Sequence, residues 1–333
     1  MGKGIKMASA VDDRRNRHTL ESLQNRAENG QTIPPLFCDG VGCSASVRFV
    51  KLGLRNGPPG KEPVERAAYI GLTSARDSDH ATSCSYNATG KLKLIIANQS
   101  DPDFLSSLDE GKHELRLQLL HNALGNSDRS VKAGYQTGSK TKDEHIRTDY
   151  IRNGGKLDGY LRTTMDILKL RERCEEDAEL SATLLLRFGN RKIPWRRFYF
   201  EQDRYEDAWK MLRKAEPSAH PFAIAGVVDR IWLPNTGSNQ RNTFLNLIPE
   251  RHKVGTDGIQ LTYGASIGHT DQEWLQQYPH GTHVIAFGLW RASDPQQNSV
   301  RRLDPHARVT GFLNHQITLF PKFKSQVIKV EMS

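Results

Sequence analysis

Three of the four cysteines in this 333-residue chain lie within one short stretch, together with a histidine. Four residues separate Cys38 from Cys43, and three separate His80 from Cys84. Two close ligand pairs with a longer segment between them are typical of tetrahedral zinc sites, which use thiolate sulfur and imidazole nitrogen. We therefore predict a structural Zn²⁺ held by all four residues. The alternative is three unrelated thiols and a surface histidine.

The same four residues argue against catalysis at this centre. A disulfide between two of the three cysteines would leave an odd thiol over, so a disulfide is the weaker interpretation. A zinc ion with four protein ligands has no open position for a substrate or an activated water. We therefore expect the ion to stabilise a module that is too small to fold around its own core.

The segment between the two ligand pairs is expected to form a β-hairpin. Residues 44–52 and 67–72 have strand character, and the turn-rich residues 55–60 lie between them. With its Cys pair, hairpin and final His-x3-Cys pair, the stretch 36–86 resembles the zinc-binding N-terminal modules of many bacterial proteins. The resemblance implies a small β module of the zinc-ribbon or treble-clef kind.

The composition indicates an anionic partner. The net charge is +9 and hydrophobic residues make up 37% of the chain, so nucleic acid is the first expectation and a membrane surface the second. No apolar run of about 20 residues is present that could span a bilayer. The N-terminus also lacks the apolar stretch of a secretory signal. Because the few cysteines are mostly assigned to metal, we expect a cytoplasmic protein. Since no segment is apolar enough to span a bilayer, we expect no membrane partner.

Changes in residue pattern predict an α+β fold in four parts. The parts are a flexible N-terminal tail with a short helix capped by Thr19 (1–35), the zinc-binding β module (36–98), a mainly helical middle region with a β-hairpin (99–216), and a β-barrel domain (217–333). In the second part we expect a strand at 91–97. In the middle region we expect helices at about 103–124 and 157–176, a linker at 126–142, strands at 182–188 and 195–200, and a short helix from Asp203 to Lys214.

The C-terminal part is predicted to be an antiparallel barrel. Strand patterns occur at 222–232, 242–248, 258–263, 281–290, 307–312, 316–320 and 326–330, with a short helix at 271–278. Five or more strands with one helix between the third and the fourth is the order of an OB fold. Residues 222–228 and 278–288 resemble segments of OB-fold nucleic-acid-binding modules. SH3-like barrels and plain meanders are the alternatives.

That resemblance implies a binding surface for a single nucleic-acid strand. Such surfaces combine a basic groove that follows the phosphates with aromatic rings on which bases stack. We predict contacts to single-stranded DNA, or to RNA, from Arg196, Arg197, Arg230, Trp232, Arg241, Tyr263, Trp290, Arg291, Lys322 and Lys324. The alternative for an aromatic residue is a place in the core, which we expect for Phe222, Phe244 and Phe287. For Arg196 and Arg197 the alternative is a charged edge strand.

An enzyme is not the main expectation. The chain has no Walker A loop, no G-x-S-x-G elbow and no G-x-G-x-x-G motif, and His113 and His121 are too far apart for a zincin helix. A metal-dependent nuclease stays open as an alternative, with ligands among Asp143, Glu144, Glu201 and Asp203. A protein-interaction adaptor is the second alternative. The main expectation is a zinc-containing, non-catalytic nucleic-acid-binding protein.

Overall fold

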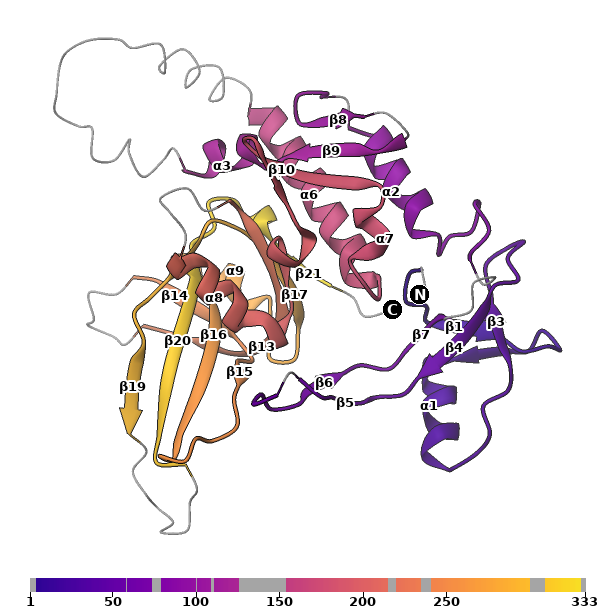
Figure 1. Cartoon of the computed structure of the whole chain (residues 1–333), viewed down its shortest axis with the longest axis horizontal. Helices are drawn as coiled ribbons and strands as arrows, with labels where there is room; N and C mark the ends of the chain where they lie inside the picture. Colours follow the sequence, from indigo (N-terminus) through magenta and orange to yellow (C-terminus); the bar gives the residue numbers. More distant parts are fainter. Residues whose placement is uncertain are drawn as a thin grey trace.

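Four β-sheets and the helices around them organise the chain, and the predicted α+β class is confirmed (Figure 1). The computed structural model describes residues 4–57, 59–73, 79–99, 101–108, 111–125, 154–214, 220–234, 241–299 and 309–330. Within these residues the sheets have five, four, ten and two strands. They lie in the N-terminal, middle and C-terminal regions, and the two-stranded sheet is an arm that reaches from the first region to the last.

The five-stranded sheet carries the predicted zinc module. Its antiparallel strands lie in the order β2 (Arg17–Thr19), β1 (Ser9–Val11), β3 (Leu36–Cys38), β4 (Ser46–Val50) and β7 (Tyr69–Leu72). The predicted hairpin is confirmed as β4 and β7, and the predicted helix as α1 (Leu20–Glu28). The expected flexible tail is wrong for residues 4–35, because β1 pairs with β3 and Ala10 is fully buried. Strands of three residues are too short to show a clear alternation.

The helix α2 (Ala88–Ala97) replaces the strand that was predicted at 91–97. The Asn87 side chain caps it by accepting a backbone hydrogen bond of 2.8 Å. Leu92 and Ile96, four residues apart, are buried on one face of the helix. The cap and this buried face outweigh the β-favouring character of the apolar run, so tertiary packing decides the structure.

The middle region builds a four-stranded mixed sheet with helices beside it. The elements are β8 (Leu105–Ser107), β9 (His113–Arg116), α3 (Leu117–Gly125), α6 (Gly154–Arg173), α7 (Ala178–Ser181), β10 (Leu184–Phe188) and β11 (Arg191–Ile193). The helix predicted at 157–176 is confirmed as α6. The helix predicted at 103–124 is wrong in its first half, where β9 pairs in parallel with β10. The predicted linker at 126–142 lies outside the described residues.

None of the helices in the described parts of the chain, α6 included, combines the length and the apolar character needed to cross a bilayer.

The connection from the middle region to the last one is mostly helical. It consists of the 3₁₀ turns η2 (Trp195–Arg197) and η3 (Gln202–Arg204), the two-residue strand β12 (Tyr199–Phe200) and the helix α8 (Tyr205–Lys214). The strand predicted at 195–200 is therefore wrong in its first half. Pro194 immediately precedes η2 as its N-terminal cap and cannot donate a ladder hydrogen bond, which suits a turn better than a strand. The predicted helix to Lys214 is confirmed.

The ten-stranded C-terminal sheet is strongly curled into a half-barrel. After β12 its strands are β13 (Phe222–Trp232), β14 (Thr243–Leu247), β15 (Glu250–Arg251), β16 (Ile259–His269), β17 (His283–Gly288), β18 (Trp290–Ala292), β19 (Gln296–Ser299), β20 (Gly311–Leu319) and β21 (Val327–Lys329), with α9 (Gln272–Gln276) after β16 and the 3₁₀ turn η4 (Lys324–Gln326) before β21. The prediction of a purely antiparallel sheet is wrong, because β20 runs parallel to β16 along nine residue pairs. Several elements connect these two strands, which gives the chain room for a parallel crossover.

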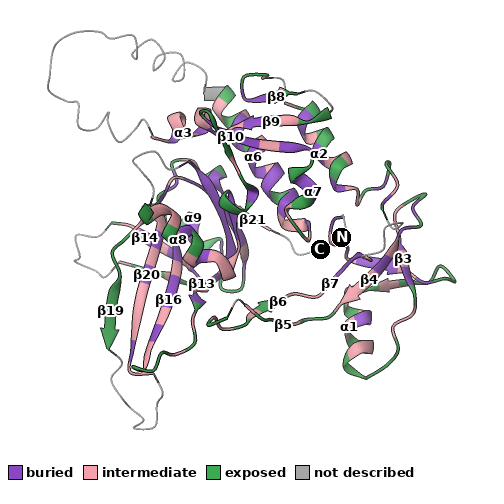
Figure 2. Cartoon of the chain, in the orientation of Figure 1, coloured by how far each residue is buried: buried purple, intermediate pink, exposed green. Residues whose placement is uncertain are grey.

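One face of this sheet is buried in the larger hydrophobic core of the chain. Along β20, buried and half-buried residues alternate from Asn314 to Leu319, whereas residues 265–268 of β16 are all buried (Figure 2). The buried face packs against α8, where the Trp209 ring meets His315 at 4.7 Å and Tyr263 at 6.1 Å. We call the opposite side the outer face. It is defined by Arg230, Asn246, Ser266, Thr318 and their same-side neighbours.

Two hydrophobic cores stabilise the chain. The larger one joins the middle helices to the C-terminal sheet, for example through Phe198 and Phe287, whose rings are 5.9 Å apart. The predicted boundary after residue 216 lies outside the described residues. The smaller core belongs to the N-terminal module and contains few large side chains, among them Met7, Leu23 and Ile70. A core of this size needs a further source of stability.

A buried histidine at the start of β13 should make the stability pH-dependent. Burial, followed by the charges of Arg191, His121 and Arg197, lowers the pKa of His220 from 6.5 to about 4. The unfolded chain therefore binds a proton between pH 6.5 and 4 that the folded chain does not bind, so stability falls as the pH falls through this window. We expect His220→Gln to remove about 3 kcal/mol of this loss, measured by urea unfolding at several pH values. Equal slopes for both proteins would contradict the assignment.

The arm is a hairpin of β5 (Gly53–Arg55) and β6 (Val64–Arg66) that crosses to the C-terminal sheet (Figure 1). Backbone hydrogen bonds join its tip to the strand β15, from the Glu62 amide to the Arg251 carbonyl at 2.8 Å and from the Lys253 amide to the Gly60 carbonyl at 2.8 Å. The tip residue Lys61 is 9% exposed at its side chain. The arm therefore extends the sheet by a short β-like contact.

Candidate metal centre and candidate nucleic-acid interface

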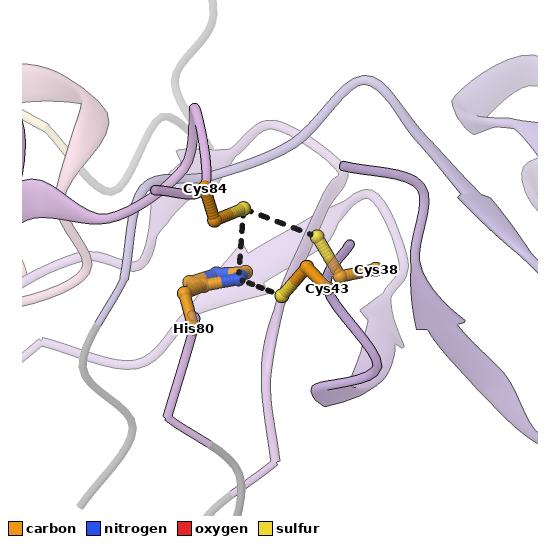
Figure 3. Close-up of side chains that lie close together, drawn as sticks. All are labelled: Cys38, Cys43, His80 and Cys84. Atoms are coloured by element: carbon orange, nitrogen blue, oxygen red, sulfur yellow. Dashed lines mark hydrogen bonds between the residues drawn. The ribbon is translucent and has the colours of Figure 1, made fainter. Parts of the chain in front are cut away.

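The four predicted metal ligands converge in the N-terminal module (Figure 3). Cys38 ends β3 and Cys43 lies in the turn that follows, whereas His80 and Cys84 lie between β7 and α2. All four residues are buried, and their ligand atoms lie within 4.8 Å of one another. The structure therefore brings the complete predicted set together, in an arrangement that could hold a metal ion.

Three of the six distances between these atoms are close to the edges of a tetrahedral zinc site. The Sγ atoms of Cys38 and Cys84 are 3.7 Å apart, and the His80 Nδ1 lies 3.5 Å from the Cys43 Sγ and 3.7 Å from the Cys84 Sγ. With a Zn–S bond of about 2.3 Å and a Zn–N bond of about 2.0 Å, tetrahedral edges are about 3.8 Å between sulfurs and about 3.6 Å between sulfur and nitrogen. A disulfide would need sulfurs about 2.05 Å apart. The residues fit a metal ion and do not form a disulfide.

Two glycines shape the loop that presents the first cysteine pair. A Cβ atom on Gly40 would lie 2.7 Å from the Cys84 Sγ and 3.3 Å from the Cys38 Sγ, so only glycine leaves the space between the sulfurs open. Gly42 has a φ of +69°, a conformation that other residues rarely adopt. The Cys43 amide then donates to the Gly40 carbonyl at 3.0 Å, which closes the turn.

Backbone amides surround the sulfurs in the way that bound thiolates require. The Gly40 amide donates to the Cys38 Sγ at 3.3 Å, and the Tyr86 amide to the Cys84 Sγ at 3.5 Å. Burial raises the pKa of the Cys38 and Cys84 thiols. A bound cation is the counter-charge that would hold these buried sulfurs as thiolates. The donor set therefore suits a cation better than an empty pocket.

His80 is oriented for metal binding through one particular nitrogen. Its Nδ1 faces the sulfurs, while its Nε2 is buried with no hydrogen-bond partner. Burial lowers the pKa of His80, which favours the neutral ring that a metal needs. A Cβ atom on Gly4 would lie 2.9 Å from the Nε2, so the N-terminal segment closes this side of the site. Cys174 is buried elsewhere, at an isolated bridge with Ile5, and takes no part.

A second group of possible ligands lies where the arm meets the C-terminal sheet. Glu206, Glu250 and His252 place their ligand atoms within 4.8 Å of one another. The Lys61 ammonium from the arm pairs with both carboxylates, with the Glu206 Oε2 at 3.1 Å. The lysine therefore already supplies the positive charge that these two carboxylates need, and this group is an ion-pair cluster. Sequence reasoning missed it, because Lys61 lies in a turn-rich segment.

Eight of the ten predicted nucleic-acid contacts are exposed side chains. They are Arg196, Arg197, Arg230, Trp232, Arg241, Arg291, Lys322 and Lys324. Tyr263 and Trp290 are only 5% and 4% exposed, so their prediction as contacts is corrected. Tyr263 stacks on His315 at 4.4 Å, and Trp290 donates from its Nε1 to the Phe222 carbonyl at 3.1 Å. Both side chains belong to the core.

Two exposed arginines lie at the ends of one row across the outer face. The strand registers place Arg230 opposite Asn246, Asn246 opposite Ser266, Ser266 opposite Thr318, and Thr318 opposite Arg291. The row crosses β13, β14, β16, β20 and β18. No acidic residue occurs in it, and its middle carries small polar groups. We call these five residues the polar row.

Arg196, Arg197 and Lys324 lie away from the polar row, whereas Trp232 lies two residues after Arg230 on the same face. Arg196 and Arg197 lie in η2, and η2 precedes the strand that pairs with the start of β13. Lys324 lies in η4 and pairs with Asp271 at 2.5 Å. The structure therefore does not gather the predicted residues into one contiguous patch.

Among the described residues, the carboxylates predicted for the nuclease alternative, Glu201 and Asp203, do not form an open metal site. Arg55 from the arm holds the Asp203 Oδ2 at 2.5 Å and the Glu201 Oε2 at 3.4 Å, and Arg171 lies 3.6 Å from the second Glu201 oxygen. These arginines neutralise the carboxylates that a divalent ion would need. Asp143 and Glu144 lie outside the described residues.

Comparisons with known proteins identify no family for this chain. No protein-family model matches the chain, and no curated protein matches it either.

Proposed function

We propose that this chain is a zinc-stabilised, non-catalytic protein that binds nucleic acid through the outer face of its C-terminal sheet. The polar row carries the proposal. Its two end arginines are exposed, with the Arg230 side chain at 77%, and four strand spacings of about 4.8 Å separate them, which is about 19 Å. Cations at this spacing over an acid-free strip suit a path of phosphates.

The net charge of the whole chain supports the same partner. At +9, the protein attracts polyanions that approach to within about 10 Å at 0.1 M salt. The arginines of the outer face offer the local contacts. Phosphate contacts of this kind bind DNA and RNA alike, since they do not read the bases.

We also propose an OB-like organisation for the half-barrel. The long strands β13, β14 and β16 come first, α9 follows, and β17 and β20 come next. One helix between the third and the fourth long strand supports this organisation. The parallel pairing of β16 with β20 is the feature that departs most from a simple meander.

The proposed Zn²⁺ would have a structural role only. Cys38, Cys43, His80 and Cys84 would hold it, and the ion would supply the cross-link between β3 and the segment before α2. Because these residues fill all four tetrahedral positions, none is open for a reacting group. The metal therefore stabilises the N-terminal module from which the arm extends.

Salt dependence tests the proposed function directly. We expect a fluorescent oligonucleotide to bind at 50 mM salt and to bind far more weakly at 200 mM, because phosphate contacts release counterions. Arg230→Gln and Arg291→Gln should each lower the slope of log K against log salt by about 0.7 to 0.9. Arg213→Gln is the matched control, since this arginine lies on α8 and pairs with Asp294. Absence of binding at 50 mM salt would refute the proposal.

A further inference from the structure

Three aromatic rings follow one another across the outer face, one row away from the polar row. Trp232 on β13 lies opposite Phe244 on β14, with ring centroids 5.9 Å apart and planes inclined by 56°. Phe320, directly after β20, lies 6.0 Å from Phe244 with planes inclined by 76°. Phe244 pairs with Gly268 on β16, which lies between the two phenylalanines. We call the three rings the aromatic row.

Gly268 lets the phenyl rings lie over the backbone. A Cβ atom at this position would lie 2.6 Å from the Phe320 ring and 2.8 Å from the Phe244 ring. With glycine, both rings cover the strand and pack edge to face with each other. The row is therefore fixed by the fold and is not a set of freely rotating side chains.

The outer members of the row are exposed to an unusual degree for large apolar side chains. Trp232 is 39% exposed and Phe320 is 43% exposed, and Leu233, the chain neighbour of Trp232, is 44% exposed. Most large apolar side chains of the described C-terminal strands are buried. Clustered exposed apolar side chains mark a surface that a partner covers.

The surroundings of the row determine the kind of partner. Arg230 lies two residues before Trp232 on the same face, so a cation flanks the rings. Within the described residues, this arginine forms an ion pair with its chain neighbour Asp229 at 3.8 Å. A ligand must therefore offer flat apolar faces and, about 7 Å away, negative charge. This is the distance between residues two apart on one strand. A single nucleic-acid strand does so, whereas a duplex hides the faces of its bases.

We propose that Trp232, Phe244 and Phe320 form a base-stacking platform that makes the outer face selective for single-stranded nucleic acid. The bases stack on the exposed rings of Trp232 and Phe320, and Phe244 holds these two rings apart. The phosphates follow the polar row, with Arg230 closest to the platform. This inference rests on the proposed function. It adds that the rings bind the bases, whereas the arginines bind the phosphates.

Binding of a labelled 12-mer oligothymidylate and of a 12-base-pair duplex, both at 50 mM salt, tests the platform. The wild-type chain should bind the single strand more tightly. Trp232→Ala and Phe320→Ala should each weaken single-strand binding about fivefold to a hundredfold, the usual range for one lost stacking contact. Duplex binding and the salt slope should stay unchanged. Trp232→Phe should recover most of the affinity.

Leu233→Ala is the matched control, because it removes exposed apolar surface without removing a ring. Thermal melts should show that all four variants are folded, since the replaced side chains lie at the surface and not in the two hydrophobic cores. If neither oligonucleotide binds, the proposed function fails together with the platform. If both bind and the ring variants bind the single strand as the wild type does, only the platform is overturned. Equally tight binding of a polyglutamate peptide that needs the same rings would overturn the platform in favour of a protein partner.

Discussion

Replacing Cys43 by serine is expected to abolish metal binding and to unfold the N-terminal module, while the C-terminal sheet stays folded. The reason is the small size of the N-terminal core, in which three of the buried residues are themselves the cysteine ligands. Structural zinc sites of this type contribute on the order of 10–16 kcal/mol of apparent binding free energy at neutral pH. Serine preserves the volume but cannot supply a thiolate, so most of that stabilisation is lost.

Amide hydrogen exchange followed by mass spectrometry is the suitable measurement. Peptides from residues 36–86 should lose their protection in Cys43→Ser, and peptides from β13 to β17 should keep it. Metal analysis of the wild-type protein should give one zinc per chain. Cys174→Ser is the matched control, because Cys174 is also buried but lies outside the site. Purified wild-type protein without bound metal, or a Cys43→Ser protein with full protection, would contradict the zinc assignment.

The metal set could be predicted from the sequence because its signal is local. The type and spacing of Cys38 and Cys43, and of His80 and Cys84, limit the ways in which these side chains can be used. The hairpin between the pairs could be predicted for the same reason, since polar and apolar residues alternate from Ser46 to Phe49 and a turn-rich segment follows. What the sequence could not show is how residues 4–19 add two strands to that hairpin, because the added strands have only three residues each.

The aromatic contacts were harder to predict, because the strand register decides which face of the sheet each side chain lies on. Tyr263 and Phe244 both lie in C-terminal strands with alternating patterns, yet Tyr263 faces the core and Phe244 the outer face. A shift of one residue in register exchanges the two faces of a strand. The bulge between Val228 and Arg230 introduces such a shift in β13. It turns Arg230 and Trp232 to the outer face, and no sequence pattern indicates it.

Replacing Lys61 by methionine is expected to destabilise the protein by about 3–5 kcal/mol at neutral pH, since one member of a buried ion pair is removed. Glu250 is 1% exposed, and without the ammonium its carboxylate would be buried without a counter-charge. Methionine has nearly the same length and apolar stem as lysine, so packing changes little. The loss should appear as a lower denaturant midpoint in urea unfolding.

The pH dependence of this variant has a defined sign. Burial raises the pKa of Glu250 even with Lys61 present, and removing the lysine should raise the pKa further. The folded variant would then take up a proton that the unfolded chain, with a carboxyl pKa of about 4.3, does not. The contribution of Glu250 to its stability should therefore rise as the pH falls from 7 towards about 4.5. The His220 contribution is the same in both proteins, so the difference in stability from the wild type should shrink. A difference that is constant over this range would contradict the buried-charge explanation.

The double variant Lys61→Met/Glu250→Gln separates the buried charge from the docking of the arm. In the double variant residue 250 no longer carries a charge, and Glu206 is still paired with Lys210 at 2.6 Å. Most of the stability should therefore return. The backbone contacts at Gly60 and Glu62 are independent of either charge and should keep the arm on β15. The measurement is amide hydrogen exchange of the arm. If the arm amides stay protected in the double variant but exchange in Lys61→Met, the backbone contacts specify the docking site and the ion pair only neutralises the buried carboxylate. If the double variant is as unstable as the single one, Lys61 does more than neutralise Glu250, and its attraction to the carboxylates keeps the arm docked. The cluster of Glu206, Glu250 and His252 is then the element that holds the N-terminal module against the sheet.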